Sequence, residues 1–315
     1  MSAPRRPPRR QVDGVLLLDK PPGLTSNGAL SRVKRLYNPD KAGHTGTLDP
    51  LASGLLPICL GSATRFAQFL LDARKRYVAT VRFGVTTATQ DADGDVVDVR
   101  PVEFDREALV ATLARFMGRQ MQVPPAHSAL KLAGKPYYDY ARRGIEIPRP
   151  AREVWIRRLD LVEWNPPDAI VDVECSKGTY IRALAADIGE ALGCGAHLAA
   201  LRRTASGGFD VENAVTLETL ESSSEAERDL RLHATPVLVA HLPALHVAPD
   251  VAERFLHGNS IPAPASIAGP TAVFDGPLLL GVADVRDGLA HPRRVIATPP
   301  HPTHELLEKQ AFFKL

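Results

Sequence analysis

Two segments near the N-terminus show clear hydrophobic patterning. Residues 15–18 form a wholly apolar run followed by Pro21, Pro22 and Gly23, which predicts a short buried strand. Apolar residues then recur at helical spacing after Ser26, so we expect Ser26 to cap a helix. The inward face of this helix is formed by Leu30, Val33 and Tyr37.

The middle of the chain alternates between irregular and periodic segments. Residues 41–61 contain several glycines and prolines and predict a loop-rich stretch, and a helix is expected over about residues 63–73. Alternating apolar residues from Tyr77 to Phe83 predict a half-buried strand. Asp105 is expected to cap the next helix. Its inward face is expected to consist of Leu109, Val110, Leu113 and Met117.

The next segment begins with a basic, proline-rich stretch at residues 124–153, which predicts a long loop. Strands are expected over about residues 154–163 and 169–175. A helix is expected over about residues 180–192, ended by Gly193.

The pattern changes again after residue 246. One short helix, capped by Asp250 and ended by Gly258, is followed by short strands with Gly and Pro turns. We therefore expect three parts, of which the first is a disordered basic tail rich in Pro and Arg. These parts are the tail at residues 1–12, a large domain at residues 13–245 and a small β-rich domain at residues 246–315.

The net charge of +2 does not by itself indicate a nucleic-acid partner, but the positive charges are unevenly placed. They gather in residues 5–10 and between Arg115 and Arg158, and such clusters attract phosphates. Three widely spaced cysteines form neither a disulfide framework nor a Cys-x-x-Cys metal site, which favours a reducing cytoplasm. The apolar run at residues 15–18 is too short for a signal peptide or a membrane span.

Motifs for a bound metal or nucleotide are lacking. The stretch from Asp91 to Asp95 resembles a calcium loop superficially, but its glycine is fourth rather than sixth, so a polar hairpin loop is expected. Gly193-Cys-Gly195 lacks the third glycine of a dinucleotide fingerprint, and no Walker lysine motif exists. We therefore expect a reaction that uses neither metal nor cofactor.

The stretch from Gly43 to Pro57, Gly-His-Thr-Gly-Thr-Leu-Asp-Pro-Leu-Ala-Ser-Gly-Leu-Leu-Pro, strongly resembles the catalytic loop of the bacterial TruB family, the tRNA pseudouridine-55 synthases. Further blocks similar to that family appear in the family's order between residues 17 and 207. They are Leu17-Leu-Asp-Lys-Pro21, Lys75-Arg-Tyr77, Pro125-Ala-His-Ser-Ala-Leu-Lys131, Gly134-Lys135, Tyr140-Ala-Arg-Arg-Gly144, Lys177-Gly-Thr-Tyr-Ile-Arg182 and Leu201-Arg-Arg-Thr-Ala-Ser-Gly207. The resemblance implies an α+β catalytic domain on a central mixed, mostly antiparallel sheet, plus a small β-barrel-like C-terminal PUA domain.

The resemblance implies that Asp49 is the catalytic carboxylate. An Asp-Pro pair is also a common turn former, and without the other blocks that interpretation is the simpler one. Making pseudouridine requires breaking the C1′–N1 glycosidic bond, turning the uracil and joining its C5 to C1′. A carboxylate suits this reaction because it can form a covalent adduct or stabilise a cationic sugar. Attack on C1′, attack on C6 of the base and a glycal-like intermediate all stay open.

The resemblance also assigns partners to this carboxylate. It pairs Arg182 with Asp49, stacks Tyr77 on the target base, and places Tyr180 against the flipped uracil. From the residues alone, these three would be an exposed helix charge, a half-buried strand aromatic and a core-filling aromatic.

Other residues receive supporting roles from the resemblance. His44 contacts the RNA, Lys20 supports the active-site floor and Leu201 lines the pocket, although a structural histidine, a turn lysine and a core leucine are simpler alternatives. The basic insertion at about residues 124–153 would grip RNA, rather than being a solvated excursion. Its expected RNA contacts are Lys131, Lys135, Arg142 and Arg143.

The implied function is isomerisation of uridine 55 in the tRNA T-loop by base flipping. The expected partner is the T-arm of tRNA, with no membrane, no obligatory protein partner and a monomeric enzyme. One alternative is a guide-RNA-dependent pseudouridine synthase, which works with protein partners; the intact insertion argues for standalone action. A second alternative is a tRNA-folding factor that uses the cleft without catalysis, which the intact set of Asp49, Tyr77 and Arg182 disfavours.

Overall fold

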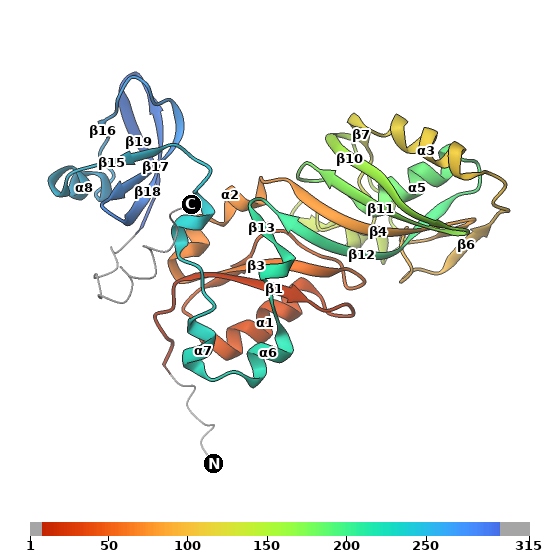
Figure 1. Cartoon of the computed structure of the whole chain (residues 1–315), viewed down its shortest axis with the longest axis horizontal. Coiled ribbons are helices and arrows are strands. Elements are labelled where there is room, and N and C mark those ends of the chain that lie inside the picture. The colour runs from red at the N-terminus through yellow and green to blue at the C-terminus, as the bar shows by residue number, and fades with distance from the viewer. Residues whose placement is uncertain (1–7, 297–315) are drawn as a thin grey trace, which may run out of the picture.

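The computed structural model describes residues 8–296. Figure 1 shows an elongated molecule in which helices pack against an extended sheet and a small second domain lies at one end. The strands of the large sheet are β1 (Gly14–Lys20), β2 (Ala42–His44), β3 (Ser53–Leu60), β4 (Lys75–Phe83), β7 (Gly118–Gln122), β10 (Arg152–Asn165), β11 (Asp168–Cys175), β12 (Ala196–Ser206), β13 (Phe209–Asp210) and β14 (Val215–Thr216).

These strands follow the order β14-β1-β3-β12-β4-β11-β10-β7, with β2 paired to β3 and β13 paired to β12. The β1–β14 and β3–β12 pairs are parallel, and the other pairs of this sheet are antiparallel. The mixed, mostly antiparallel sheet that the sequence predicts is therefore confirmed. The second domain has its own sheet, in the order β15-β17-β18-β19-β16, which is consistent with the expected PUA-like module.

The remaining elements surround these sheets. The second sheet consists of β15 (Ala244–His246), β16 (Ile261–Pro262), β17 (Gly269–Asp275), β18 (Leu278–Arg286) and β19 (Leu289–Val295). Two small hairpins consist of β5 (Val85–Thr87) with β6 (Val96–Val99) and of β8 (Lys131–Leu132) with β9 (Lys135–Pro136). The α-helices are α1 (Ser26–Tyr37), α2 (Ala67–Leu71), α3 (Arg106–Arg115), α4 (Tyr137–Ala141), α5 (Ile181–Ala191), α6 (Leu217–Ser222), α7 (Glu225–Asp229) and α8 (Pro249–Leu256), and short 3₁₀ turns lie at Gly61–Arg65, Val211–Asn213 and Thr235–Leu238.

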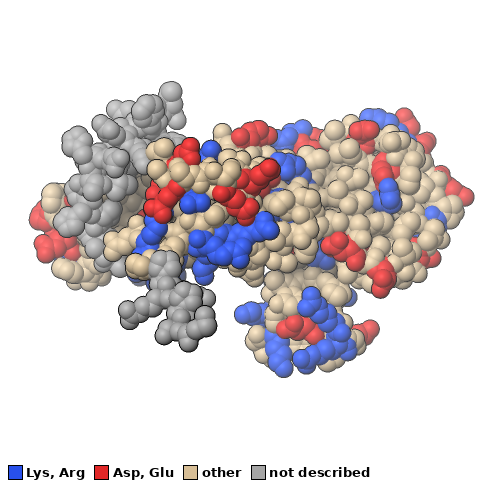
Figure 2. Space-filling view, turned by 90° about the horizontal axis from the view of Figure 1, so that it is seen from below, with Lys and Arg blue, Asp and Glu red and all other residues tan. Residues whose placement is uncertain are grey.

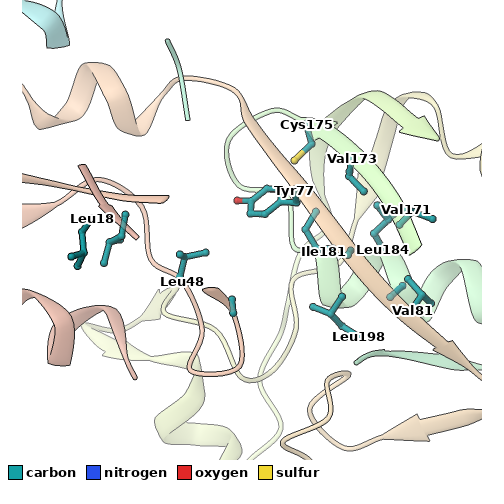
Figure 3. Close-up of a cluster of buried hydrophobic side chains, with 14 of the residues drawn as sticks. Leu18, Leu48, Tyr77, Val81, Val171, Val173, Cys175, Ile181, Leu184 and Leu198 are labelled. Atoms are coloured by element: carbon teal, nitrogen blue, oxygen red, sulfur yellow. The ribbon is translucent and has the colours of Figure 1, made fainter. Parts of the chain in front are cut away.

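The main core lies between the large sheet and helices α1, α3 and α5. The predicted alternation in β4 is confirmed, since Tyr77, Ala79, Val81 and Phe83 are all buried in this core. Figure 3 shows Tyr77 and Val81 beside Val171 and Val173 of β11 and Ile181 and Leu184 of α5.

A second apolar cluster joins the two domains. Val15 and Leu17 of β1 face away from the main core, and they belong to a cluster that includes Leu279 and Val282 of the second domain. The short 3₁₀ and α2 segment contributes Phe66 to the same cluster. The two domains therefore share buried apolar surface rather than being joined only by a linker.

The prediction that residues 41–61 are loop-rich is wrong for β3, which is a central strand with residues 54–60 buried. Its two faces belong to different apolar clusters, so the run Leu55–Leu60 shows no alternation of apolar and polar residues. Pro57 lies within this strand, and its carbonyl accepts a hydrogen bond from Thr45 at 3.0 Å.

Several predicted helix details are corrected. Thr25, not Ser26, caps α1, because the Thr25 side chain accepts from the Gly28 amide at 2.9 Å. The Asp105 cap of α3 is confirmed, because the Asp105 side chain accepts a hydrogen bond from the Ala108 amide at 2.8 Å.

The inward face of α3 is narrower than predicted. Leu109 and Leu113 are buried, but Val110 and Met117 are exposed, because one sheet edge covers only part of this helix. The predicted Asp250 cap of α8 is wrong. Ala248 occupies the N-cap position without a side-chain hydrogen bond, and Asp250 lies in the first turn.

Residues 8–12, which we assigned to the N-terminal tail, lie against the large domain. Arg10 lies 2.6 Å from the carboxylate of Asp229, and Val12 is buried. Residues 1–7 and 297–315, which we assigned to the tail and to the C-terminal domain, lie outside the described residues.

Gly54 lies where β3 pairs in parallel with β12, and the register places it beside Arg203. Its φ of +100° suits glycine, and a Cβ atom at this position would collide with the Arg203 backbone. We predict that Gly54→Ala lowers the free energy of unfolding by about 3 kcal/mol, measured by urea denaturation. The control is Gly208→Ala, which meets no neighbouring atom and should change it by less than about 0.5 kcal/mol. Equal stability of the two variants would contradict the prediction.

Candidate active site

Arg182, the second residue of α5, is the centre of the candidate site. It is buried, and its Nε lies 2.9 Å from Oδ2 of Asp49 and 3.4 Å from Oδ2 of Asp91. Its Nη1 and Nη2 each donate at 2.9 Å, to the carbonyl oxygens of Thr89 and His127. One guanidinium therefore holds together α5, the loop after β2, the β5–β6 hairpin and the start of the insertion.

Asp49 lies in the loop between β2 and β3, and its side chain is 39% exposed. Burial raises the pKa of this carboxyl above its ordinary value, Arg182 opposes the rise, and the negative charge of Asp91 adds to it. Of these causes, desolvation by burial is the largest. The result is a half-buried carboxylate with a fixed cation on one side and an open side toward solvent.

Tyr77 forms the buried floor beside this carboxylate. The ring is 9% exposed, and Figure 3 shows its hydroxyl directed away from Ile181 and Cys175, toward the side of Leu48. Burial raises the pKa of the Tyr77 hydroxyl, while a hydrogen bond and the charge of Arg203 oppose that rise.

Tyr180 is half-buried at the N-terminus of α5. Its backbone N–H donates to Gln122 at 2.8 Å, and its carbonyl accepts from the same amide at 3.1 Å. Gln122 of β7 is buried, so it fixes the backbone of Tyr180 from both sides. Burial raises the pKa of the Tyr180 hydroxyl, and Ser128 at the start of the insertion opposes that rise.

Two buried cations lie near the loop that carries Asp49. Lys20 is fully buried, and its Nζ donates to the carbonyl oxygens of Pro21 at 2.8 Å and Leu24 at 2.6 Å. Burial lowers the pKa of Lys20 to about 8, and the charge of Asp49 opposes that shift. Arg203 of β12 donates to the carbonyl oxygens of Leu55 at 2.6 Å and Gly46 at 3.1 Å.

His44 and Leu201 lie at the margins of the site. His44 is half-buried at the end of β2, and burial together with the charge of Arg203 lowers the pKa of its imidazole. Such an imidazole is neutral at physiological pH. Leu201 of β12 is partly buried and packs against the main core, so a structural role explains its position without a ligand.

The insertion forms a separate basic lobe. Figure 2 shows Lys and Arg gathered over a lobe that projects from the body. Lys131, Lys135, Arg142 and Arg143 are all exposed there, and within residues 8–296 none of them forms an ion pair. The Arg142 guanidinium lies 5.4 Å from the centre of the Tyr138 ring. The insertion reaches the Asp49 site through its base, at His127, whereas its cations lie on its surface.

The charge of Asp49 contributes an upward shift to the pKa of Lys20, Tyr77 and Tyr180. The structure thus brings together five of the predicted site residues, namely Asp49, Arg182, Tyr77, Tyr180 and Lys20.

The structure adds three residues to which the sequence analysis gave no role in the site, namely Asp91, Gln122 and Arg203. The predicted hairpin loop around Asp91 is confirmed, but Asp91 is buried against Arg182 instead of facing solvent. No local pattern distinguishes such a residue from a turn former, because its partner lies 91 positions later in the chain.

Residues 8–296 contain no group of three or more His, Cys, Asp or Glu side chains arranged to hold a metal ion. Cys59, Cys175 and Cys194 are free and buried. Over the same range, no helix is long and apolar enough to cross a membrane.

Family models match most of the chain. The model described as TruB family pseudouridylate synthase (N terminal domain) matches residues 34–181. The tRNA pseudouridylate synthase B C-terminal domain matches residues 182–240, and the model described as Pseudouridine synthase II TruB, C-terminal matches residues 243–296.

Curated relatives and solved structures agree with these matches. The tRNA pseudouridine synthase B of Azoarcus sp. (strain BH72) is 55% identical over 93% of this chain and 98% of its own. The protein of the same name from Chromobacterium violaceum is 58% identical over 83% of this chain and 85% of its own. A crystal structure of a Cbf5-Nop10-Gar1 complex contains a chain that is 28% identical with a TM-score of 0.69, covering 92% of this chain and 85% of that one. This chain therefore belongs to the TruB family of pseudouridylate synthases.

Proposed function

We propose that this protein isomerises uridine 55 in the T-loop of tRNA to pseudouridine, with Asp49 as the catalytic carboxylate. The observation that carries the proposal is the 2.9 Å contact between the half-buried Asp49 and the buried Arg182, in a chain of this family. The names of relatives that are more than half identical support tRNA as the substrate.

The geometry suits a carboxylate that acts on the sugar or the base of a flipped nucleotide. Arg182 cannot leave Asp49 easily, because two backbone carbonyls hold its other nitrogens. The raised pKa makes Asp49 a stronger nucleophile than a carboxylate in water, while the charge of Arg182 limits that rise. Tyr77 and Tyr180 would hold the uracil removed from its RNA stack.

The reaction needs no external reagent. The C1′–N1 bond breaks, the uracil turns, C5 bonds to C1′ and then gives up its proton, and N1 gains a proton, so no electrons are exchanged with a cofactor. We therefore propose a reaction without metal or cofactor. We also propose that the enzyme is monomeric and cytoplasmic. The exposed cations of the insertion, Lys131, Lys135, Arg142 and Arg143, would contact the RNA backbone.

The guide-dependent alternative draws support from one observation, the likeness to a chain solved in a Cbf5-Nop10-Gar1 complex. The identity to that chain is 28%, against 55% for the curated Azoarcus relative, so standalone action is favoured. The two alternatives differ in what the pure protein does. We would incubate it with an unmodified tRNA and with a bare T-arm hairpin, and map pseudouridine before and after. Modification only in the presence of added guide RNA or protein would overturn the proposal.

The substitution Asp49→Asn keeps the shape of the side chain but removes its negative charge. Its kcat should fall by more than about a thousandfold, measured as pseudouridine formed in T-arm RNA. The dissociation constant for RNA should change by less than about threefold, because binding relies mainly on backbone contacts. Near wild-type turnover would refute the role of Asp49, and lost activity with retained RNA binding also separates catalysis from a folding role.

The second prediction concerns pH. The rate should fall as pH drops through the raised pKa of Asp49, because the protonated carboxyl is not a nucleophile. Asp91→Asn removes a negative charge that raises this pKa, so the acid limb of single-turnover rates should move to lower pH. The control is Asp93→Asn, whose smaller influence on Asp49 should give a smaller shift in the same direction. An acid limb that moves upward, or not at all, in Asp91→Asn would contradict the assignment.

The third prediction concerns the insertion. Lys131→Ala combined with Arg143→Ala removes two unpaired exposed cations, so the slope of log affinity for tRNA against log salt should become shallower by about 1.5. Arg82→Ala is the matched control, because Arg82 is paired with Asp168 at 2.7 Å. It should leave the salt slope unchanged. Equal effects of the two changes would show that the insertion does not grip RNA specifically.

A further inference from the structure

The start of α1 contacts the catalytic loop on one side of Asp49. Ser26 is 2% exposed, and its Oγ donates to the Leu48 carbonyl at 2.9 Å and accepts from the Leu48 amide at 2.7 Å. One hydroxyl therefore satisfies both backbone polar groups of Leu48, whose side chain is itself buried in the main core. Without Ser26, these two groups would lose the hydrogen bonds that the protein supplies.

The same segment contacts the loop on the other side of Asp49. The amide of Gly23 donates to the Pro50 carbonyl at 2.8 Å. Asp49 therefore lies between two residues whose backbones are bonded to residues 23–26. We call this pair of contacts the α1 clamp, consisting of Ser26 on Leu48 and Gly23 on Pro50.

The clamp is attached to a rigid base. Lys20 bonds the carbonyls of Pro21 and Leu24 from the buried side, which fixes the turn that precedes α1. Thr25 caps the helix through the Gly28 amide, so Ser26 is not needed for capping. The Ser26 hydroxyl is instead free to bond a segment 22 residues away.

We propose that Ser26 is a positioning residue for the reaction: it fixes the Leu48 peptide and thereby the distance and angle of the Asp49 carboxylate to Arg182 and to the substrate. This inference rests on the proposed function of Asp49. Arg182 holds the carboxylate at its tip, whereas the clamp holds the backbone from which it extends. A displacement of about 1 Å in a reacting group can lower a rate about a hundredfold, so loss of one anchor should be visible in catalysis.

The ordinary alternative is that Ser26 contributes only to the stability of α1. Thr25 provides the matched control, because Thr25→Ala removes the true cap of the same helix without touching Leu48. Both variants should lower the melting temperature. A general weakening of α1 would affect catalysis in both variants, whereas the clamp predicts an effect in Ser26→Ala alone.

The experiment compares wild type, Ser26→Ala and Thr25→Ala in two measurements. In T-arm RNA, Ser26→Ala should lower kcat at least about tenfold with KM nearly unchanged, and Thr25→Ala should retain the wild-type kcat. In hydrogen exchange, the Leu48 amide should be protected in wild type and Thr25→Ala and should exchange faster in Ser26→Ala.

The proposal is overturned by a kcat of Ser26→Ala within about twofold of wild type, or by an equal loss of kcat in Thr25→Ala. Unchanged exchange of the Leu48 amide in Ser26→Ala also overturns it. If the wild-type protein forms no pseudouridine in any tRNA, the proposed function fails, and the exchange at Leu48 alone then decides whether the clamp exists.

Discussion

The guanidinium of Arg182 is the interaction on which the arrangement of the site depends. It is buried, and a buried cation is stable only when its charge and its N–H groups meet acceptors. The carbonyls of Thr89 and His127 accept hydrogen bonds from its Nη atoms, and the carboxylates of Asp49 and Asp91 balance its charge. These groups come from three segments, namely the loop after β2, the β5–β6 hairpin and the start of the insertion. Removing any one segment would leave part of a buried charge unsatisfied, so the need to solvate Arg182 within the protein holds the loops in place.

The sheet explains how residues far apart in sequence reach this point. Strands β3, β12 and β4 are neighbours, which brings Gly54, Arg203 and Tyr77 into register across three strands. Helix α5 follows β11 and packs on the face of the large sheet that contains the main core. From there, Arg182 reaches Asp49 in the loop before β3. The loop that carries Asp49 is thus held by Arg203 from the sheet and by Ser26 from α1.

Local patterns predicted strands β1 and β4 and the cap of α3, but they missed the central strand β3. The alternation of β4 and the Asp105 cap were predictable, because one local rule decides each. Strand β3 was read as a loop, because the glycines and prolines of residues 41–61 outweighed its apolar run, which shows no alternation. The family blocks pointed to Asp49 and Arg182, but Asp91 and Gln122 act through partners distant in sequence, which spacing cannot reveal. Ser26 was assigned to capping in place of Thr25, because the two residues are adjacent and both types are favoured as N-caps.

The net charge of +2 conceals the division of charges between surfaces. On the outer face of β4, β10 and β11, Arg76 and Arg158 share Asp172, at 2.6 and 3.0 Å. The two arginines are partly exposed and Asp172 is buried, and the shared carboxylate offsets the charge of the arginines. The insertion cations have no such partners within the described residues, so their charge is available to phosphates. Electrostatic attraction of RNA depends on where cations are unpaired, and a chain with almost balanced charge can therefore present one basic lobe and one neutral sheet face.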